Sequence, residues 1–216
     1  MKAQYIKRTG SDTLTLFFAG WGMDARPFDD HTGGGDLLVL YDYTDLGFDT
    51  SFTESYLHYR VVAWSMGVWA ASCTVPSLSL DITESVAVGG TSTPVSEEFG
   101  IAPAIFRGTL DGLGERSLMS FRRRMCGGAT AAAEFERCAP ERGIESLREE
   151  LRAIGDTSAV KRGTMRWDRA VVTLRDAIFP SEAQRAAHAR DAANVVTEAD
   201  VPHYHRDTLR AIIEGR

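Results

Sequence analysis

Ser65 is the residue of this chain whose surroundings most clearly suggest chemistry. It stands in the pentapeptide AWSMG at residues 63–67, which follows a short apolar run and precedes a plausible helix over residues 68–73. In this strand–turn–helix context a sharp turn exposes a serine hydroxyl as a nucleophile. The usual pattern has glycine two positions before and two positions after the serine. Here Ala63 takes the first position and Gly67 the second. The alternative is a serine that caps a core helix.

A serine hydroxyl is a weak nucleophile and needs a base beside it. The chain has five histidines, which are His31, His58, His188, His203 and His205. Where nucleophile, acid and base follow one another in that order along the chain, only the last three are eligible. We predict that His203 is the base, because it follows the last expected strand and precedes an aromatic residue. His205 remains an alternative, and His188 is expected on a solvated helix face.

An acid that orients the imidazole is expected between the serine and the base. Asp176 lies in the stretch RDAIFP at residues 175–180, directly after an expected strand and before an apolar pair and a helix-starting proline. A carboxylate in such a strand-end loop suits this role. The alternative is an aspartate that caps a helix or faces solvent. The histidines show no convincing metal-ligand spacing, so we predict no metal and no cofactor.

Attack on an ester carbonyl produces an oxyanion that needs backbone N–H donors. One donor is expected to be the amide of Met66, directly after the nucleophile. The second is assigned to the amide of Trp21, because the loop AGWGMD at residues 19–24 follows an expected strand and has glycines on both sides of the tryptophan. The side chains of Trp21, Trp64 and Phe121 are expected to bind substrate. Both tryptophans are also explained as large core residues.

Six short apolar runs are the expected strands that position these residues. They cover residues 13–19, 37–41, 61–64, 85–88, 170–174 and 194–196. Near-continuous apolar strands separated by helical stretches are typical of a mostly parallel sheet with helices on both faces. In such sheets the ligand crevice lies at the carboxyl ends of the strands.

The stretch between the fourth and fifth expected strands is too long for a simple crossover. We interpret residues 99–161 as a helical cap insertion over the carboxyl ends of the strands. Within it, the small residues 126–133 predict a loose turn between cap helices. Together with the order of serine, acid and histidine, this organisation predicts the α/β class and the α/β-hydrolase fold. Its core would comprise residues 1–98 and 162–216.

The composition excludes several other classes. A net charge of −6 argues against a nucleic-acid binder. No window approaches the roughly 18 apolar residues of a membrane span, and the first residues lack the apolar run of a signal peptide. Three cysteines without a CxxC pair argue against a disulfide framework. We therefore expect a soluble, cytoplasmic and monomeric protein that binds neither nucleic acid nor membrane.

Four segments of the chain resemble one known family. They are FFAGWGMD at residues 17–24, YDYTDL at 41–46, AWSMG at 63–67 and PHY at 202–204. Together they are similar to the BioG-type pimeloyl-[acyl-carrier protein] methyl ester esterases. The similarity spans nearly the whole chain and is strongest over residues 14–70.

The resemblance implies a reaction and a partner. The family removes the methyl ester from pimeloyl-[acyl-carrier protein] during biotin biosynthesis and releases methanol. By this resemblance Ser65 attacks the ester, His203 moves the proton, and Asp176 holds the imidazole. The partner implied is acyl carrier protein that carries a pimeloyl methyl ester.

An acidic carrier protein conflicts with a net charge of −6 unless basic residues gather locally. Arg122, Arg123 and Arg124 form the most obvious basic cluster, and no acid stands among their immediate neighbours. Arginine suits both phosphate groups and carboxylate-rich helices, so we predict carrier binding there. The alternative is a solvated helix face on which arginines pair with acids. The acids of this segment are Glu134, Glu136, Glu145, Glu149 and Glu150.

Two further hypotheses stay open on the sequence. A general short-chain carboxylesterase or thioesterase would use the same three side chains without recognising a carrier protein. A non-catalytic binding or scaffold protein would have kept the serine by descent. That last hypothesis is harder to reconcile with an acid, a base and an oxyanion loop that all occur in order.

Overall fold

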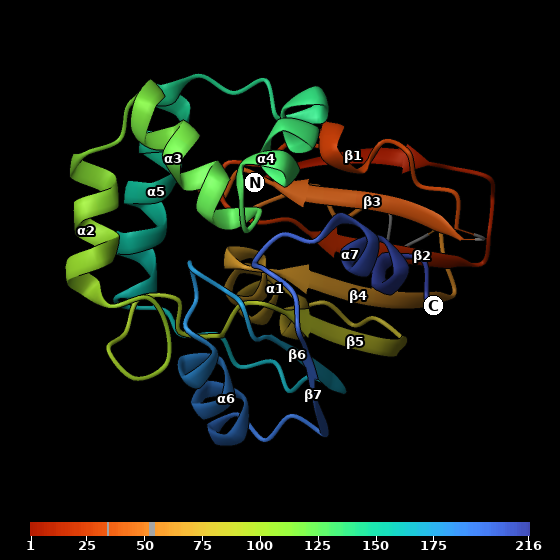
Figure 1. Cartoon of the computed structure of the whole chain (residues 1–216). Coiled ribbons are helices and arrows are strands. Elements are labelled where there is room, and N and C mark those ends of the chain that lie inside the picture. Colours follow the sequence, from red (N-terminus) through yellow and green to blue (C-terminus); the bar gives the residue numbers. More distant parts are fainter. Residues whose placement is uncertain (34, 52–54) are drawn as a thin grey trace.

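The computed structural model describes residues 1–33, 35–51 and 55–216 and is built around one seven-stranded sheet (Figure 1). The strand order is β1-β3-β2-β4-β5-β6-β7. β1 pairs antiparallel with β3, and the other five pairings are parallel. The strands are β1 (Lys2–Lys7), β2 (Thr13–Phe18), β3 (Asp36–Tyr41), β4 (His58–Trp64), β5 (Ile82–Val88), β6 (Arg169–Thr173) and β7 (Val195–Ala199).

All six strands expected from apolar runs are present, and their ends differ from the expected ones by at most three residues. β1 is an addition that the sequence analysis did not predict. Its sequence, KAQYIK, has no apolar run. It is an edge strand, and its first three residues are exposed. An edge strand buries few side chains, so its sequence needs few apolar residues and is hard to predict as a strand.

Helices cover both faces of the sheet and one end of it. The α-helices are α1 (Met66–Thr74), α2 (Pro103–Asp111), α3 (Glu115–Met125), α4 (Ala129–Phe135), α5 (Ile144–Ser158), α6 (Ser181–Arg190) and α7 (Arg206–Ile213). The short 3₁₀ helices are η1 (Arg26–Phe28), η3 (Val75–Ser77) and η4 (Glu136–Cys138). Among the described residues, no helix is long and apolar enough to cross a membrane.

Successive side chains of β2 enter two apolar cores. Leu16 and Phe18 pack in a cluster that includes Trp69 of α1. Phe17 packs in a second cluster that includes Ile212 of α7. α1 and α7 therefore cover opposite faces of the sheet. Because each face of the central strands is buried, these strands read as continuous apolar runs rather than as alternating ones.

Helices α2 to α5 lie between β5 and β6, within the segment predicted as an insertion. α2, α3 and α5 stand together beyond the arrowheads of β3 and β4, at the carboxyl ends of the strands (Figure 1). The predicted turn over residues 126–133 is wrong in its second half. Gly127 and Gly128, with φ of 76° and 157°, make the turn, and the alanine-rich run from Ala129 already forms α4. Alanine is the strongest helix former.

The alternative of a solvated helix face does not hold for Glu150 of α5. Its side chain is fully buried, together with Leu147, Leu151 and Ile154. Positions three and four apart share one face of a helix, so Glu150 lies on the same face as Leu147 and Ile154. The buried charge is met by Arg142, whose Nη1 lies 2.6 Å from Glu150 Oε2.

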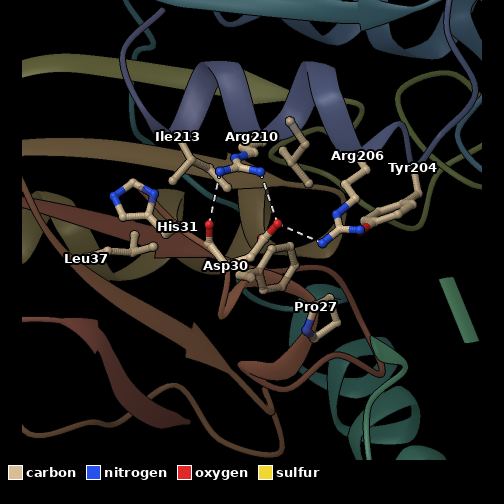
Figure 2. A pocket seen from close by; sticks show the side chains of 10 residues that line it. Pro27, Asp30, His31, Leu37, Tyr204, Arg206, Arg210 and Ile213 are labelled. Atoms are coloured by element: carbon tan, nitrogen blue, oxygen red, sulfur yellow. Dashed lines mark hydrogen bonds and ion pairs between the residues drawn. The ribbon is translucent and has the colours of Figure 1, made fainter. Parts of the chain in front are cut away.

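A cluster of ion pairs fastens α7 to the loop after η1. Figure 2 shows Asp30 between Arg206 and Arg210 of α7, at 2.7 and 3.1 Å. Nearby, Glu214 accepts hydrogen bonds from the backbone amide and the hydroxyl of Thr32, at 2.9 and 3.0 Å. The charged groups of this cluster are thus paired with one another. Their effect is to fix the start of α7, just after residues 202–204.

This cluster predicts an acid-sensitive part of the stability. Burial raises the pKa of Glu214, but hydrogen bonds from Thr32, Arg210 and Arg216 outweigh it and lower the pKa from 4.5 to about 2. Such a group stabilises the native state above its unfolded pKa, and that contribution is lost as the pH falls through the folded pKa. Glu214→Gln is expected to lower stability at neutral pH and to flatten the decline between pH 4.5 and 2.

Urea unfolding of the two proteins at several pH values measures this difference. Glu97→Gln, which changes an exposed acid, is the matched control. Parallel pH profiles for Glu214→Gln and the unmodified chain would contradict the prediction.

Candidate active site

Ser65 occupies a strained bend between β4 and α1. Its φ is 59° and its ψ is −127°, a conformation that residues with a side chain rarely adopt and that costs about 1–3 kcal/mol. The bend is held by the neighbouring strand β5, because the Ser65 amide donates to the carbonyl of Val88, at 3.0 Å. It ends β4 and directs the hydroxyl to the edge of the sheet where the parallel strands end.

Close backbone contacts explain the small residues around the bend. A Cβ on Gly67 would lie 2.2 Å from the carbonyl oxygen of Phe18, and one on Gly90 would lie 2.1 Å from that of Ser65. Neither position therefore accepts a side chain. Ala63, which replaces the first glycine of the usual pattern, is fully buried in β4, where it is the register partner of Phe18 and of Ala87.

The structure brings the three predicted catalytic side chains together. His203 Nε2 lies 2.9 Å from Ser65 Oγ, and His203 Nδ1 lies 2.7 Å from Asp176 Oδ2. The ring is 12° from parallel to that of Phe179, and the Trp64 indole donates to the His203 carbonyl at 2.8 Å. His203 is thus held at its ring and at its backbone, in the loop between β7 and α7.

The two other eligible histidines lie elsewhere. His205, the alternative base, is the N-cap of α7; its Nδ1 lies 2.8 Å from the hydroxyl of Thr208 and accepts from the amide of the same residue. The prediction that His188 is solvated is wrong. Its side chain is buried in α6, and that burial lowers its pKa.

Asp176 is held as a carboxylate by four donors besides the histidine. Oδ1 accepts from the amides of Ile178 and Phe179, both at 2.8 Å. Oδ2 accepts from the hydroxyl of Thr173 at 2.6 Å and from the side-chain amide of Gln184 at 3.2 Å. Burial raises the pKa of Asp176, but the positive charge of a protonated imidazole and these hydrogen bonds outweigh it and bring the pKa below its ordinary value.

Thr173 and Gln184 were not identified from the sequence. Gln184 is fully buried; its Oε1 accepts from the Thr173 amide at 3.0 Å, and its Nε2 donates to the Phe179 carbonyl at 2.7 Å. A threonine at a strand end and a glutamine inside a helix are ordinary in sequence. One sequence signal could have pointed to Gln184. It lies in α6 next to Ala183 and three residues before Ala187, and both alanines are on the buried face of the helix.

The two predicted oxyanion donors flank Ser65. Met66 is the first residue of α1, and the first amides of a helix have no intrahelical acceptor. The loop that carries Trp21 lies against the nucleophile: a Cβ on Gly20 would be 2.9 Å from the Trp64 ring and 3.2 Å from Ser65 Cβ. Within the described ranges, neither the Trp21 nor the Met66 amide has an acceptor in the protein. Both amides are therefore available to a developing oxyanion.

A cavity that opens to solvent is lined by Ser65 and His203; the space within it and at its opening is about 640 Å³. The three residues predicted to bind substrate, Trp21, Trp64 and Phe121, all line it. The remaining lining is mostly apolar and comes largely from α2, α3 and α5, with Ile101, Ile105, Phe106, Met125, Leu151 and Ile178 among its members. An activated serine at the wall of an apolar cavity can carry out acyl transfer on an uncharged ester or thioester.

The three predicted carrier-binding arginines have different surroundings. The guanidinium of Arg122 lies 3.0 Å from Glu136 and over the ring of Phe135, so an acid 14 positions away in sequence already pairs with it. Arg124 lines the mouth of the cavity. In the part of the chain that the structure describes, neither Arg123 nor Arg124 has an ion-pair partner.

The chain is similar to one known family and to several known proteins. The sequence profile of the family described as pimeloyl-ACP methyl esterase BioG matches residues 1–210. A crystal structure of BioG from Haemophilus influenzae is similar with a TM-score of 0.87 and 33% identity, over 96% of this chain and 96% of that chain. A lipase-esterase related protein from Clostridium acetobutylicum has a TM-score of 0.64 at 9% identity, over 99% of this chain and 95% of its own, which shows a shared fold alone. The predicted α/β-hydrolase fold is confirmed.

A relative in Bacteroides fragilis is 44% identical over 197 residues. It is named malonyl-[acyl-carrier protein] O-methyltransferase. The match covers 90% of this chain and 40% of that protein, so this chain spans less than half of the length of its relative.

The contacts of Asp176 predict a loss of rate on substitution. Asp176→Asn keeps the size of the side chain but removes the charge that stabilises the imidazolium, and its amide group favours the wrong tautomer of His203. We expect kcat for an activated ester such as p-nitrophenyl butyrate to fall about 10⁴-fold. The exposed Asp156→Asn is the matched control. Retention of the unmodified rate by Asp176→Asn would refute this assignment of the acid.

Proposed function

This chain belongs to the BioG family of pimeloyl-ACP methyl esterases, and from that premise we propose that it hydrolyses the methyl ester of pimeloyl-[acyl-carrier protein] in biotin biosynthesis. The products are pimeloyl-[acyl-carrier protein] and methanol. The observation that carries the proposal is the connected set Ser65, His203 and Asp176, with distances of 2.9 and 2.7 Å, at the wall of an apolar cavity.

The first half of the reaction forms an acyl-enzyme. Ser65 Oγ attacks the ester carbonyl carbon while His203 Nε2 takes the hydroxyl proton. The oxyanion accepts hydrogen bonds from the amides of Trp21 and Met66. Asp176 stabilises the positive imidazolium. The bond between the carbonyl carbon and the methoxy oxygen then breaks, and methanol leaves with the proton from Nε2.

The second half restores the enzyme. A water molecule gives a proton to His203 Nε2 and attacks the carbonyl carbon of the acyl-enzyme. The oxyanion forms again on the same amides, and the bond to Ser65 Oγ breaks as Oγ regains the proton. The far end of the pimeloyl chain is now a free carboxylate.

The lining of the cavity favours the ester over the product. A methyl ester is uncharged and its chain is apolar, so both suit the largely apolar wall around Ser65. The product carboxylate is charged, and a charge without a partner is costly in such a place. The cavity therefore admits the masked end of the chain and disfavours the unmasked one.

Local charge supports a carrier-bound substrate. Arg123 and Arg124 are exposed on α3, and Arg124 lies at the cavity mouth. We propose that these two arginines meet the phosphate of the carrier's prosthetic arm and the acidic carrier surface. Arg122 is left out of this role because it pairs with Glu136. The proposed setting is the reducing cytoplasm, which accords with the unpaired state of Cys73, Cys126 and Cys138.

Reversal of charge at the cavity mouth separates carrier recognition from general esterase activity. The double variant Arg123→Glu/Arg124→Glu is expected to raise KM for the carrier-linked methyl ester by about tenfold or more. Its rate on free dimethyl pimelate is expected to change little. Arg152→Glu on α5, which reverses another exposed charge, is the matched control.

Equal efficiency of the unmodified chain on free and carrier-linked esters would instead favour a general carboxylesterase. The comparison needs both substrates at matched concentrations and release of methanol as the readout.

A biotin-requiring strain that lacks its own methyl esterase gives the test in a cell. The unmodified chain is expected to restore growth without biotin, and Ser65→Ala is expected to fail because no nucleophile remains. Ser77→Ala, at a serine outside the site, should restore growth like the unmodified chain. Rescue by Ser65→Ala would defeat the proposed mechanism.

A further inference from the structure

The loop after β2 is held by the helical segment between β5 and β6. The indole Nε1 of Trp21 donates to the backbone carbonyl of Leu147 in α5, at 3.0 Å. The next amide, that of Gly22, donates to the carboxylate Oε2 of Glu150 in the same helix, at 3.2 Å. Trp21 is thus anchored by its own side chain and by the peptide that follows it.

The rest of this loop is held from the same side. Arg142 Nη1 donates to the carbonyl of Met23 at 3.3 Å, and the amide of Glu141 donates to Asp24 Oδ2 at 2.9 Å. Every residue of the run 21–24 therefore contacts a residue of the run 141–150.

Glu150 is the centre of these contacts. Its side chain is 0% exposed, and its two oxygens accept from three groups. Oε2 accepts from Gly22 and, at 2.6 Å, from Arg142, while Oε1 accepts from the amide of Tyr43 at 3.0 Å. The phenol of Tyr43 in turn donates to the carbonyl of Ala19, at 2.6 Å, where the loop begins. One carboxylate is thus connected to the loop directly at Gly22 and, through Tyr43, at Ala19.

A buried carboxylate is an unusual choice if packing alone is required. Taking an ion pair out of water costs several kcal/mol, and well-packed apolar residues are often as stabilising in its place. Burial raises the pKa of Glu150, against the pull of Arg142 and of the amides of Tyr43 and Gly22. What an apolar residue cannot supply is an acceptor for two backbone amides at once.

We propose that Glu150 is a positioning residue of the reaction: it fixes the peptide of Gly22 and thereby aims the preceding amide of Trp21 at the oxyanion. This inference rests on the proposed function, because it needs Trp21 as an oxyanion donor. Gly22 has a φ of 76°, a conformation open to glycine, so its peptide has freedom that the carboxylate removes. α5 is then a fixed part of the oxyanion site rather than a mobile cover.

Hydrolysis of p-nitrophenyl butyrate by Glu150→Leu tests the proposal. A glutamine could keep its one acceptor oxygen toward Gly22 and Arg142, whereas leucine has no acceptor, so the Gly22 amide loses its partner. We expect kcat to fall about 30-fold or more, toward the 10²–10³ of a lost oxyanion donor, while KM changes by less than about threefold. Glu149→Leu, at the exposed neighbour in α5, is the matched control and should leave kcat unchanged.

A trifluoromethyl ketone provides the readout that a purely structural role would not move. It forms the tetrahedral oxyanion with the serine, so its affinity should fall by the same factor as kcat. The corresponding methyl ketone, which stays largely unreacted, should bind equally to both proteins. Glu150→Asp keeps the charge opposite Arg142 but shortens the reach to Gly22. Glu150→Asp should likewise bind the trifluoromethyl ketone more weakly and the methyl ketone equally well. It provides the test if loss of the charge unfolds the chain.

Three outcomes decide the matter. Unchanged kcat in folded Glu150→Leu or Glu150→Asp overturns the proposal. A lower kcat with unchanged affinity for the trifluoromethyl ketone also overturns it. An unmodified chain that hydrolyses no ester at all refutes the proposed function, and this inference with it.

Discussion

The left-handed bend at Ser65 is the constraint on which the site depends. Its φ of 59° turns the chain from β4 into α1 and leaves the hydroxyl at the rim of the sheet. So tight a turn draws the neighbouring backbone close, and no Cβ fits at Gly67 or Gly90. Strain of this kind persists only where the surroundings over-determine the conformation. The hydrogen bond from Ser65 to Val88 and these close contacts supply that restraint.

Parallel strands explain how residues from distant parts of the chain meet at this bend. Ser65 follows β4, Asp176 follows β6 and His203 follows β7, and these three strands end at the same edge of the sheet. The imidazole is then set by what surrounds it. Asp176 is fixed by two backbone amides and two side chains, and the ion pairs of Asp30 anchor the helix that begins after His203. The reacting atoms are thus arranged by groups that take no part in bond formation.

The helices beyond the sheet contribute in two ways. α2 and α3 supply apolar walls and, at Arg124, a cation at the cavity mouth. α5 holds the loop of Trp21 through Leu147 and Glu150. The same segment therefore supplies the apolar lining of the cavity and restrains the loop that lies beside Ser65. Within the described structure, Arg123 and Arg124 of α3 have no ion-pair partner, so a chain with a net charge of −6 still has a local positive charge beside the cavity.

The sequence by itself determined the six apolar strands and the fold, because burial on both faces of a parallel sheet leaves continuous apolar runs. It also pointed to Ser65, Asp176 and His203, since the order of motifs along the chain follows from the order of the strands. Only the tertiary structure decided the long-range polar contacts. The sequence left Glu150 on a solvated face as an alternative and showed no acid among the immediate neighbours of Arg122. In the structure Glu150 is buried against Arg142, and Arg122 pairs with Glu136. Such pairings join residues from different elements, and a local pattern holds no information about which elements will meet.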